Sequence, residues 1–205
     1  MCIRDRLEDQ FYSKFPNASF SPYDVYTIYK DNKGSIWFGT ANFGVCRFDG
    51  KNLAWIDEEE LTAMDDGPAP GIRSIIEDKD GNFWFSNILY QYRVSPNNST
   101  IPKKELIDYQ KLKGVGPVKT QNGVEFTFFM SAINDKHGNL WMATYDTGVW
   151  KYDGENLRHY PIKTGDTSVT LFSIYKDRQD VLWLGTHNFG VFKFNGEVFE
   201  KFNSK

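Results

Sequence analysis

Few residues of this 205-residue chain stand at spacings typical of a chemical site. The sequence contains no Gly-x-Ser-x-Gly motif, no cysteine paired with a histidine, and no glycine-rich loop that would cradle a phosphate. Its histidines, His137, His159 and His187, show no metal-ligand spacing. We therefore predict that the chain binds no metal ion, carries no cofactor and has no catalytic residues.

One acid–base pair remains as an alternative. Asp146 and His187 occupy matching loops of two repeated units, which are derived below. A carboxylate and an imidazole brought together there would form a general-base pair. Under this alternative the protein is an enzyme, so the position of these two side chains decides between the two interpretations.

An acidic segment could suggest calcium. The stretch DEEELTAMDD, residues 57–66, is followed by GPAPG. It lacks the alternating oxygen-ligand spacing of a calcium loop. We interpret it as a solvated insertion between repeats, in which residues 57–64 would form at most two helical turns.

Composition and charge exclude several classes of function. Hydrophobic residues make up 40% of the chain and aromatic residues 17%, which favours packed strands. The net charge of −3 and the pI of about 5.7 argue against binding to nucleic acid or an anionic membrane. No apolar run approaches the roughly 18 residues of a membrane span, so we expect no membrane insertion of this segment.

The first six residues, MCIRDR, resemble the translation of a transposase-type sequencing adapter. We therefore expect residues 1–6 to be an artefact and residues 7–205 to form a single domain. The alternative is a genuine short leader, although it lacks the apolar core of a secretory signal. Without Cys2, Cys46 has no partner for an internal disulfide.

The main organising feature is a repeat. The stretch SIWFGTANFGVCRFDG, residues 35–50, returns as VLWLGTHNFGVFKFNG, residues 181–196, with nine of 16 positions identical. Two further copies begin at Asn82 and Asn139. The anchoring residues Trp37, Trp84, Trp141 and Trp183 are spaced by 47, 57 and 42 positions. A period of about this length with short strands predicts an all-β propeller, in which each repeat is one blade.

Each unit predicts a four-stranded antiparallel meander. A first strand ends in Asp-x-x-Gly, where the glycine provides the positive φ of a tight turn. Asp49-Gly50, Asp153-Gly154 and Asn195-Gly196 predict hairpins before the outer strand. Asp180 replaces the turn glycine in unit four, and we expect it to adopt a left-handed conformation. Unit two lacks the hairpin signal after Val94. The four predicted blades span residues 25–57, 72–110, 126–162 and 169–202.

Residues 10–16 resemble the outer strand EVFEKF of unit four and predict the end of a preceding blade. On this basis we expect an open arc cut from a larger propeller of about seven blades. The alternative is a closed four-bladed ring, in which residues 10–16 only lead into the first blade.

The pattern Asp-x-x-Gly-x-[Ile/Leu]-Trp-[Phe/Leu]-Gly-Thr-x-x-x-Gly resembles the two-component regulator propeller repeat of bacterial sensors. Units one, three and four match this repeat closely, whereas unit two matches through its Trp84. The resemblance implies a periplasmic or cell-surface recognition module, often linked to glycan sensing and to a histidine kinase in the full-length protein. It implies no shared catalytic motif. Some propellers, such as streptogramin lyases, are nevertheless enzymes that use loop histidines and a metal, which keeps the Asp146–His187 alternative open.

The loops between the second and third strands are the predicted ligand-binding region. Repeats vary where they meet a partner and keep their core alike. Asn42 and Asn188 are either turn formers or ligand contacts. We expect Phe43 and Phe189 to be exposed, since Thr147 at the same position of unit three would leave a hole in a core. The candidate ligand-binding residues are Asn42, Phe43, Tyr145, Asp146, His187, Asn188 and Phe189.

These residues predict a module that binds a polar ligand with an apolar face, such as an oligosaccharide. A scaffold for protein–protein contacts is not separable from this interpretation by sequence. The four tryptophans fall in mid-strand at the repeat period, and we expect them to pack between blades.

Overall fold

The computed structural model describes residues 13, 24–56, 58, 61, 71–95 and 106–203. These residues fall into two compact units. One lies within residues 1–75 and 94–110, and the other lies within residues 76–93 and 111–205. The predicted artefact at residues 1–6 lies outside the described residues. In the predicted strand at residues 10–16 only Ser13 is described, and its backbone is helical.

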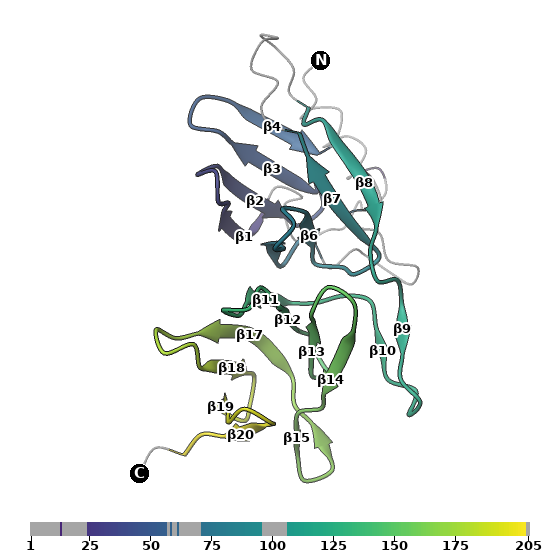
Figure 1. Ribbon diagram of the computed structural model, residues 1–205, viewed down its shortest axis with the longest axis vertical. Coiled ribbons are helices and arrows are strands. Elements are labelled where there is room, and N and C mark those ends of the chain that lie inside the picture. The colour runs from purple at the N-terminus through teal and green to yellow at the C-terminus, as the bar shows by residue number, and fades with distance from the viewer. Residues whose placement is uncertain are drawn as a thin grey trace. The chain divides into compact units, whose positions relative to one another are not determined.

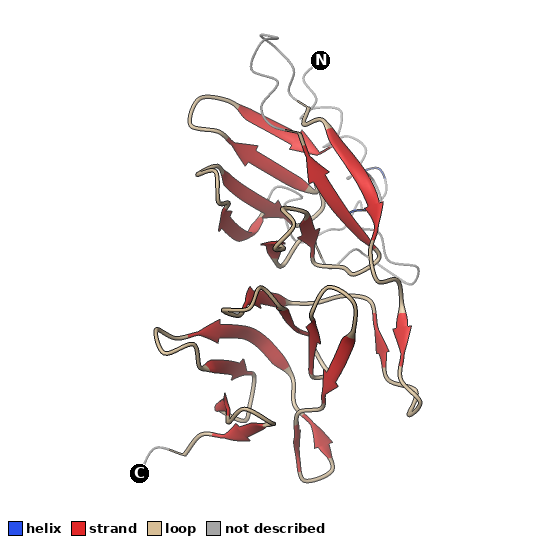
Figure 2. Ribbon diagram, in the orientation of Figure 1, coloured by secondary structure: helices blue, strands red, loops and turns tan. Residues whose placement is uncertain are grey.

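The fold is an all-β propeller with four blades, as predicted (Figures 1 and 2). Each blade is a four-stranded sheet whose strands follow one another in chain order, which is the connectivity of an antiparallel meander. Blade one contains β1 (Val25–Lys30), β2 (Ile36–Thr40), β3 (Val45–Phe48) and β4 (Leu53–Ile56). Blade two contains β5 (Ile75–Glu77), β6 (Phe83–Phe85), β7 (Tyr90–Val94) and β8 (Tyr109–Lys113). Blade three contains β11 (Ser131–Asn134), β12 (Leu140–Ala143), β13 (Val149–Tyr152) and β14 (Leu157–Tyr160). Blade four contains β17 (Leu171–Lys176), β18 (Leu182–Thr186), β19 (Val191–Phe194) and β20 (Phe199–Lys201).

Two short hairpins lie in the links between blades. They are β9 (Val118–Lys119) with β10 (Glu125–Phe126), and β15 (Lys163–Thr164) with β16 (Thr167–Ser168). The first hairpin packs on blade three, because the ring of Phe126 stacks on Trp150 with centroids 4.9 Å apart. Of the predicted helical segment 57–64, Glu58 and Leu61 are described, and Leu61 has a 3-10 backbone.

A carboxylate and a tryptophan close the first turn of every blade. In each unit the Asp of the Asp-x-x-Gly turn lies six positions before the Trp and accepts a hydrogen bond from its indole Nε1–H. The four distances are 2.9, 2.9, 2.9 and 2.8 Å for Asp31–Trp37, Asp78–Trp84, Asp135–Trp141 and Asp177–Trp183. We call these turns, residues 31–34, 78–81, 135–138 and 177–180, the turn ends of the blades.

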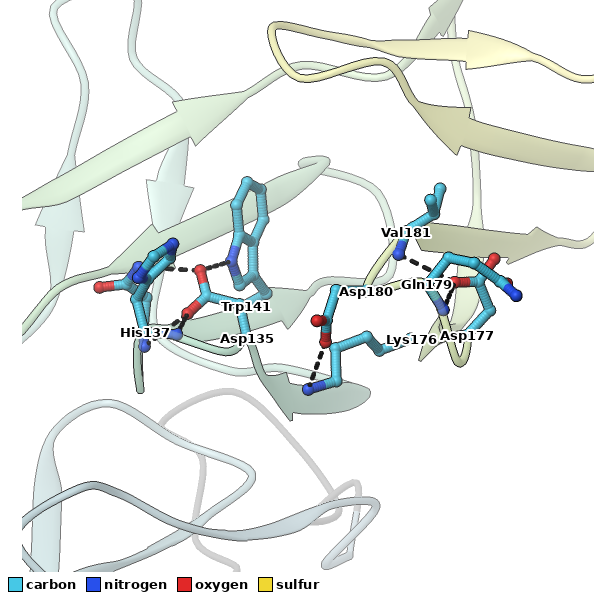
Figure 3. Close-up of polar contacts among 9 residues, drawn as sticks. Asp135, His137, Trp141, Lys176, Asp177, Gln179, Asp180 and Val181 are labelled. Atoms are coloured by element: carbon cyan, nitrogen blue, oxygen red, sulfur yellow. Dashed lines mark hydrogen bonds and ion pairs between the residues drawn. The ribbon is translucent and has the colours of Figure 1, made fainter.

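The other carboxylate oxygen of the same Asp holds the backbone of the turn. In blade three, Asp135 Oδ1 accepts the backbone N–H groups of His137 and Asn139 at 2.9 and 3.0 Å. In blade four, Asp177 does the same for Gln179 and Val181, both at 2.9 Å. Figure 3 shows both turns, with the indole of Trp141 directed at Asp135. The turn therefore depends on the Asp as much as on the glycine.

These hydrogen bonds favour the charged carboxylate. Burial opposes ionisation of Asp135, yet the bonds from Trp141 and Asn139 together hold its pKa below the ordinary 3.8. The hydrogen bond from Trp183 is the main cause of the lowered pKa of Asp177. Both turns are consequently most stable with an ionised Asp.

The fourth position of each turn has a positive φ. Gly34, Gly81 and Gly138 have φ values of 88°, 78° and 79°, and Asp180 has 62°. The expected left-handed conformation of Asp180 is confirmed. Its carboxylate also lies 3.2 Å from the amine of Lys176 (Figure 3).

The tryptophans of blades two and three pack against the following blade, as predicted. Trp84 contacts the ring of Tyr152 edge-on with centroids 5.8 Å apart, and Trp141 contacts Phe194 at 5.0 Å. Trp141 belongs to a core that joins blades three and four and also contains Val149, Leu171, Ile174 and Leu184. Packing between successive blades is thus the main source of buried apolar surface in this unit.

Candidate recognition site

A threonine shapes the loop between the second and third strands in three of the blades. Its Oγ1 accepts a backbone N–H three residues later and donates to the carbonyl of the following glycine. For Thr144 these distances are 3.0 and 2.8 Å. Thr40 and Thr186 make the same pair of bonds, at 2.9 and 3.0 Å and at 3.0 and 2.7 Å. We call these loops, residues 41–43, 87–89, 145–147 and 187–189, the loop ends of the blades.

Blade two builds its loop differently. Asn87 takes the place of the threonine, three residues after Trp84, and the preceding Ser86 has a φ of 56°. The buried amide of Asn87 accepts the backbone N–H of Leu89 at 3.0 Å and donates to the carbonyl of Phe85 at 3.0 Å. With Asn87 engaged in this way, the loop presents no exposed polar side chain at that position.

A bulge in the first strand of blade four adds an exposed ring to the site. Leu171 pairs with Thr186 and Ser173 pairs with Gly185, so Phe172 is the extra residue. Bulges re-aim a side chain and are common beside binding sites. The side chain of Phe172 is 45% exposed. Sequence reasoning missed this residue, although the position before the Ser or Thr of each unit varies as Tyr26, Arg73, Met130 and Phe172.

Three rings form a row across the loop ends of blades three and four. Tyr145 and Phe172 meet edge-on with centroids 6.0 Å apart, and Phe172 and His187 meet edge-on at 5.6 Å. Tyr145 is 51% exposed and His187 is also exposed. The backbone supports this arrangement, because Leu171 N–H donates to the carbonyl of Tyr145 at 2.9 Å. Such a row offers an apolar surface with polar edges.

The loop end of blade one differs. Tyr26 occupies the equivalent bulge, between the pairs Val25–Thr40 and Thr27–Gly39. The guanidinium carbon of Arg73 lies 3.7 Å from the centre of the Tyr26 ring, so the cation covers it. The ring face that is open in blade four is occupied here.

The structure separates the predicted site residues into two groups. Tyr145, Asp146, His187 and Asn188 are exposed at the loop ends of blades three and four. Asn42 is partly buried in blade one. Among the described residues, Ser86 and Asp180 are the non-glycine positions with positive φ, so Asn42 and Asn188 do not shape their loops through that conformation. Threonine hydroxyls make the loop hydrogen bonds instead.

The expected exposure of Phe43 and Phe189 is wrong. Phe43 is only 8% exposed, and Phe189 is partly buried against the core of blades three and four. Blade three avoids a hole at this position because Thr147 Oγ1 lies 2.8 Å from Thr144 Oγ1. The ring of His159 adds a 2.6 Å hydrogen-bond contact from Nε2 to the Thr147 carbonyl. The two phenylalanines are therefore packing residues and not the exposed rings that the sequence predicted.

Asp146 and His187 do not form the general-base pair considered above. Asp146 and His187 share no hydrogen bond, and the His187 ring contacts Phe172 instead. Burial raises the pKa of Cys46 to about 12, so its thiol is not a nucleophile at neutral pH. Within the described residues, no group of three or more His, Cys, Asp or Glu side chains could hold a metal ion. No helix in that same part of the chain has the length and apolarity to cross a membrane.

The sequence matches a family model in three places. Residues 19–42, 66–88 and 165–188 match the family described as two component regulator propeller. These stretches fall in units one, two and four. Unit two thus resembles the repeat over more than its Trp84, contrary to expectation. No curated protein matches the sequence significantly.

Solved structures with a similar fold are much longer. The extracellular domain of BT4673 from B. thetaiotaomicron, described as a one component and as a hybrid two component system, has a TM-score of 0.55 and 20% identity. The match covers 88% of this chain and 22% of that domain. PorZ, a surface component of the type-IX secretion system of Porphyromonas gingivalis, has a TM-score of 0.52 and 16% identity. Here the match covers 87% of this chain and 27% of PorZ.

An enzyme is also similar in fold. A virginiamycin B lyase from Staphylococcus aureus has a TM-score of 0.54 and 13% identity, with 92% of this chain and 59% of the lyase covered. At such identities the similarity concerns the fold alone. The chain is thus a β-propeller with an Asp–Trp turn in each blade, and three of its segments are two component regulator propeller repeats.

Proposed function

We propose that this chain is the non-catalytic ligand-recognition module of a bacterial two-component-type sensor or exported surface protein. The observation that carries the proposal is the exposed row formed by Tyr145, Phe172 and His187. Large exposed rings cost free energy in water unless a partner covers them. Tyr145 and His187 stand on threonine-shaped loops and Phe172 stands at the bulge of β17, so the backbone of the row is fixed, which suits recognition.

The chemistry of the row favours a sugar-like ligand. The rings provide an apolar surface, whereas the exposed Asp146 carboxylate and Asn188 amide stand in the same loops. A pyranose has an apolar C–H face that can lie on a ring and hydroxyl groups that can bond to carboxylate and amide oxygens. An oligosaccharide therefore matches both the apolar rings and the polar side chains of the site.

The similarity to BT4673 supports a wider proposal. That structure is the extracellular domain of a one-component or hybrid two-component system. We infer a periplasmic or cell-surface location for this propeller and a histidine kinase module elsewhere in the full-length protein. The present chain spans about a fifth of that domain, so this inference concerns the whole protein rather than the site.

The enzyme alternative has one observation in its favour, the fold shared with virginiamycin B lyase. The edge contact between Phe172 and His187 argues against an Asp146–His187 base pair. Turnover of a bound ligand that disappears in Asp146→Ala would favour the enzyme over the recognition module.

The test is a double variant of the exposed row. Tyr145→Ala with Phe172→Ala should weaken binding on an oligosaccharide array, because each lost ring contact costs about 1 kcal/mol or more. Two such losses reduce affinity by roughly tenfold to a hundredfold. The melting temperature should stay within a few degrees of the wild type, since both side chains are about half exposed.

Tyr175→Ala is the matched control, because Tyr175 is 63% exposed on the same blade but lies outside the loop ends. It should bind the array as the wild type does. Equal binding by the double variant and the wild type would disprove the site. A wild type that binds no oligosaccharide but captures a protein through these rings would favour the scaffold instead.

A further inference from the structure

Blades two and three leave a hollow of about 510 Å³ beside their turn ends. Blade four packs two rings, Phe194 and Phe199, against the tryptophan of blade three. At the same two positions blade three has Tyr152 and Leu157, and of these Tyr152 packs against the tryptophan of blade two. We call the space beside Tyr152 the turn-end hollow. Its lining includes Asp78, Lys79, Asp80, Asn82, Arg93 and Tyr152.

Arg93 stands in this hollow at a position where the other blades have an acidic or amide residue. Phe83 pairs with Tyr92, so Arg93 lies two residues beyond the partner of the repeat tryptophan. The side-chain oxygen at that position accepts two backbone N–H groups of a hairpin in each of the other blades. The residues at this position are Asp49, Asp153 and Asn195. Blade two therefore replaces a hairpin acceptor with a cation.

The guanidinium of Arg93 is held in place by a neutral group. Its Nε donates to Asn82 Oδ1 at 3.2 Å, and the amide nitrogen of Asn82 donates to Asp78 Oδ2 at 3.4 Å. Asn82 is only 5% exposed, so this support is buried. Within the described part of the chain, no carboxylate forms an ion pair with Arg93. The two terminal nitrogens of the guanidinium are thus available for a planar acceptor such as a carboxylate.

A second cation reaches the same hollow from the turn end of blade two. The amine of Lys79 donates to the backbone carbonyl of Asp153 in blade three at 3.2 Å. A side chain on Gly154 would lie 2.9 Å from this amine, so glycine leaves room for it. A backbone carbonyl does not neutralise the lysine. Both cations of the hollow therefore keep their charge for a ligand.

The acidic side chains of the hollow differ in their engagement. Asp78 accepts the backbone N–H groups of Asp80 and Asn82 and the indole of Trp84, so its oxygens are occupied. The Asp80 side chain is exposed. Burial raises the pKa of Tyr152, and the charge of Asp78 raises that pKa further. A ligand in the hollow thus meets cations together with acidic acceptors, and it needs an anionic group and hydrogen-bond donors.

We propose that the turn-end hollow binds a small hydroxy acid, such as a uronic acid. The ligand carboxylate lies between Arg93 and Lys79, and its hydroxyl groups donate to Asp80. The volume suits one sugar ring, because pockets for small molecules measure about 300–1,000 Å³. This site is independent of the exposed row of rings, because it uses no residue of the loop ends.

The experiment measures binding of glucuronate to the full chain by calorimetry at low salt. The wild type should bind glucuronate and should bind glucose roughly tenfold more weakly or worse, because glucose lacks the carboxylate. Arg93→Gln should weaken glucuronate binding by roughly tenfold or more, since hydrogen bonds to charged groups are the stronger ones. Lys79→Gln should also weaken it, and this variant leaves the Arg93–Asn82 bond intact.

Lys136→Gln is the matched control, because Lys136 is the second residue of the blade-three turn, as Lys79 is in blade two, and does not line the hollow. It makes the same change in net charge and should bind glucuronate as the wild type does. Tyr145→Ala with Phe172→Ala should also bind it normally, which separates this site from the proposed recognition site. Failure of the wild type to bind glucuronate, equal binding of glucose, or equal losses in Lys136→Gln and the two hollow variants would overturn the proposal.

Discussion

The turn ends and the loop ends of the blades differ in which side chains are the same in every blade. At the turn ends an Asp binds a Trp and two backbone N–H groups, and the Asp–Trp bond recurs in all four blades at 2.8–2.9 Å. At the loop ends a Thr fixes the backbone in three blades, whereas the exposed side chains differ from blade to blade. The repeated chemistry maintains the fold, and the varied chemistry is available for recognition.

The same contrast explains why acidic residues of one blade have unequal roles. Asp135 accepts four hydrogen bonds at the turn end, including the one from the buried Trp141. Asp146 is exposed at the loop end of the same blade. Removal of the Asp135 carboxylate leaves buried donors without an acceptor, whereas removal of the Asp146 carboxylate leaves no buried group unpaired.

The largest predicted effect is therefore that of Asp135→Ala. Loss of the acceptor for the Trp141 indole should cost about 3 kcal/mol of unfolding free energy. In a chain of this size that corresponds to a fall in melting temperature of about 10 °C. Asp146→Ala is the control and should change stability by less than about 0.5 kcal/mol. Similar melting temperatures for the two variants would remove the distinction between the ends.

Acid should destabilise the fold through the turn ends only at low pH. The folded-state pKa values of Asp135 and Asp177 lie below the ordinary 3.8, so their contribution to stability is complete above that pH. It is lost as the pH falls through the lowered folded-state values. We expect acid unfolding, followed by circular dichroism, to have its midpoint below pH 4. A midpoint above pH 5 would show that other groups control acid stability.

The smallest predicted effect concerns the one turn end without glycine. Asp180→Gly should change the unfolding free energy by less than about 1 kcal/mol, because relief of the left-handed backbone offsets the lost ion pair with Lys176. Asp180→Ala should be destabilised by about 1 kcal/mol, since alanine lacks the ion pair and tolerates positive φ poorly. Thermal melts of the two variants should rank glycine above alanine. The reverse order would mean that backbone conformation does not limit this turn.

The fold was predictable because its signals are local and repeated. The four tryptophans at the repeat period and the Asp-x-x-Gly turns determine four meander blades, and Asp180 behaves as its position predicts. The Asp–Trp bond was missed, although an Asp precedes each of the four repeat tryptophans by six residues. The constant six-residue interval between the Asp and the Trp would have been enough to predict this hydrogen bond.

The candidate site was less predictable because side-chain direction depends on packing between blades. Phe43 is buried and Phe189 is partly buried. Their exposure was expected because a threonine stands at this position in blade three, where Thr147 and His159 close the loop by hydrogen bonds instead. Phe172 is exposed because a bulge adds one residue to the first strand of blade four. A bulge changes the pairing of two strands, and the sequence of one strand does not reveal it.

The threonine-shaped loops have a consequence for how such a protein can change. In each of these loops the hydroxyl and the following glycine carbonyl set the backbone without help from the first two residues between them. In blades three and four, where both positions are exposed, substitutions there can therefore accumulate without refolding the blade. Tyr145-Asp146 in blade three and His187-Asn188 in blade four are two outcomes on one framework. The exposed side chains of these loops can thus change one blade at a time.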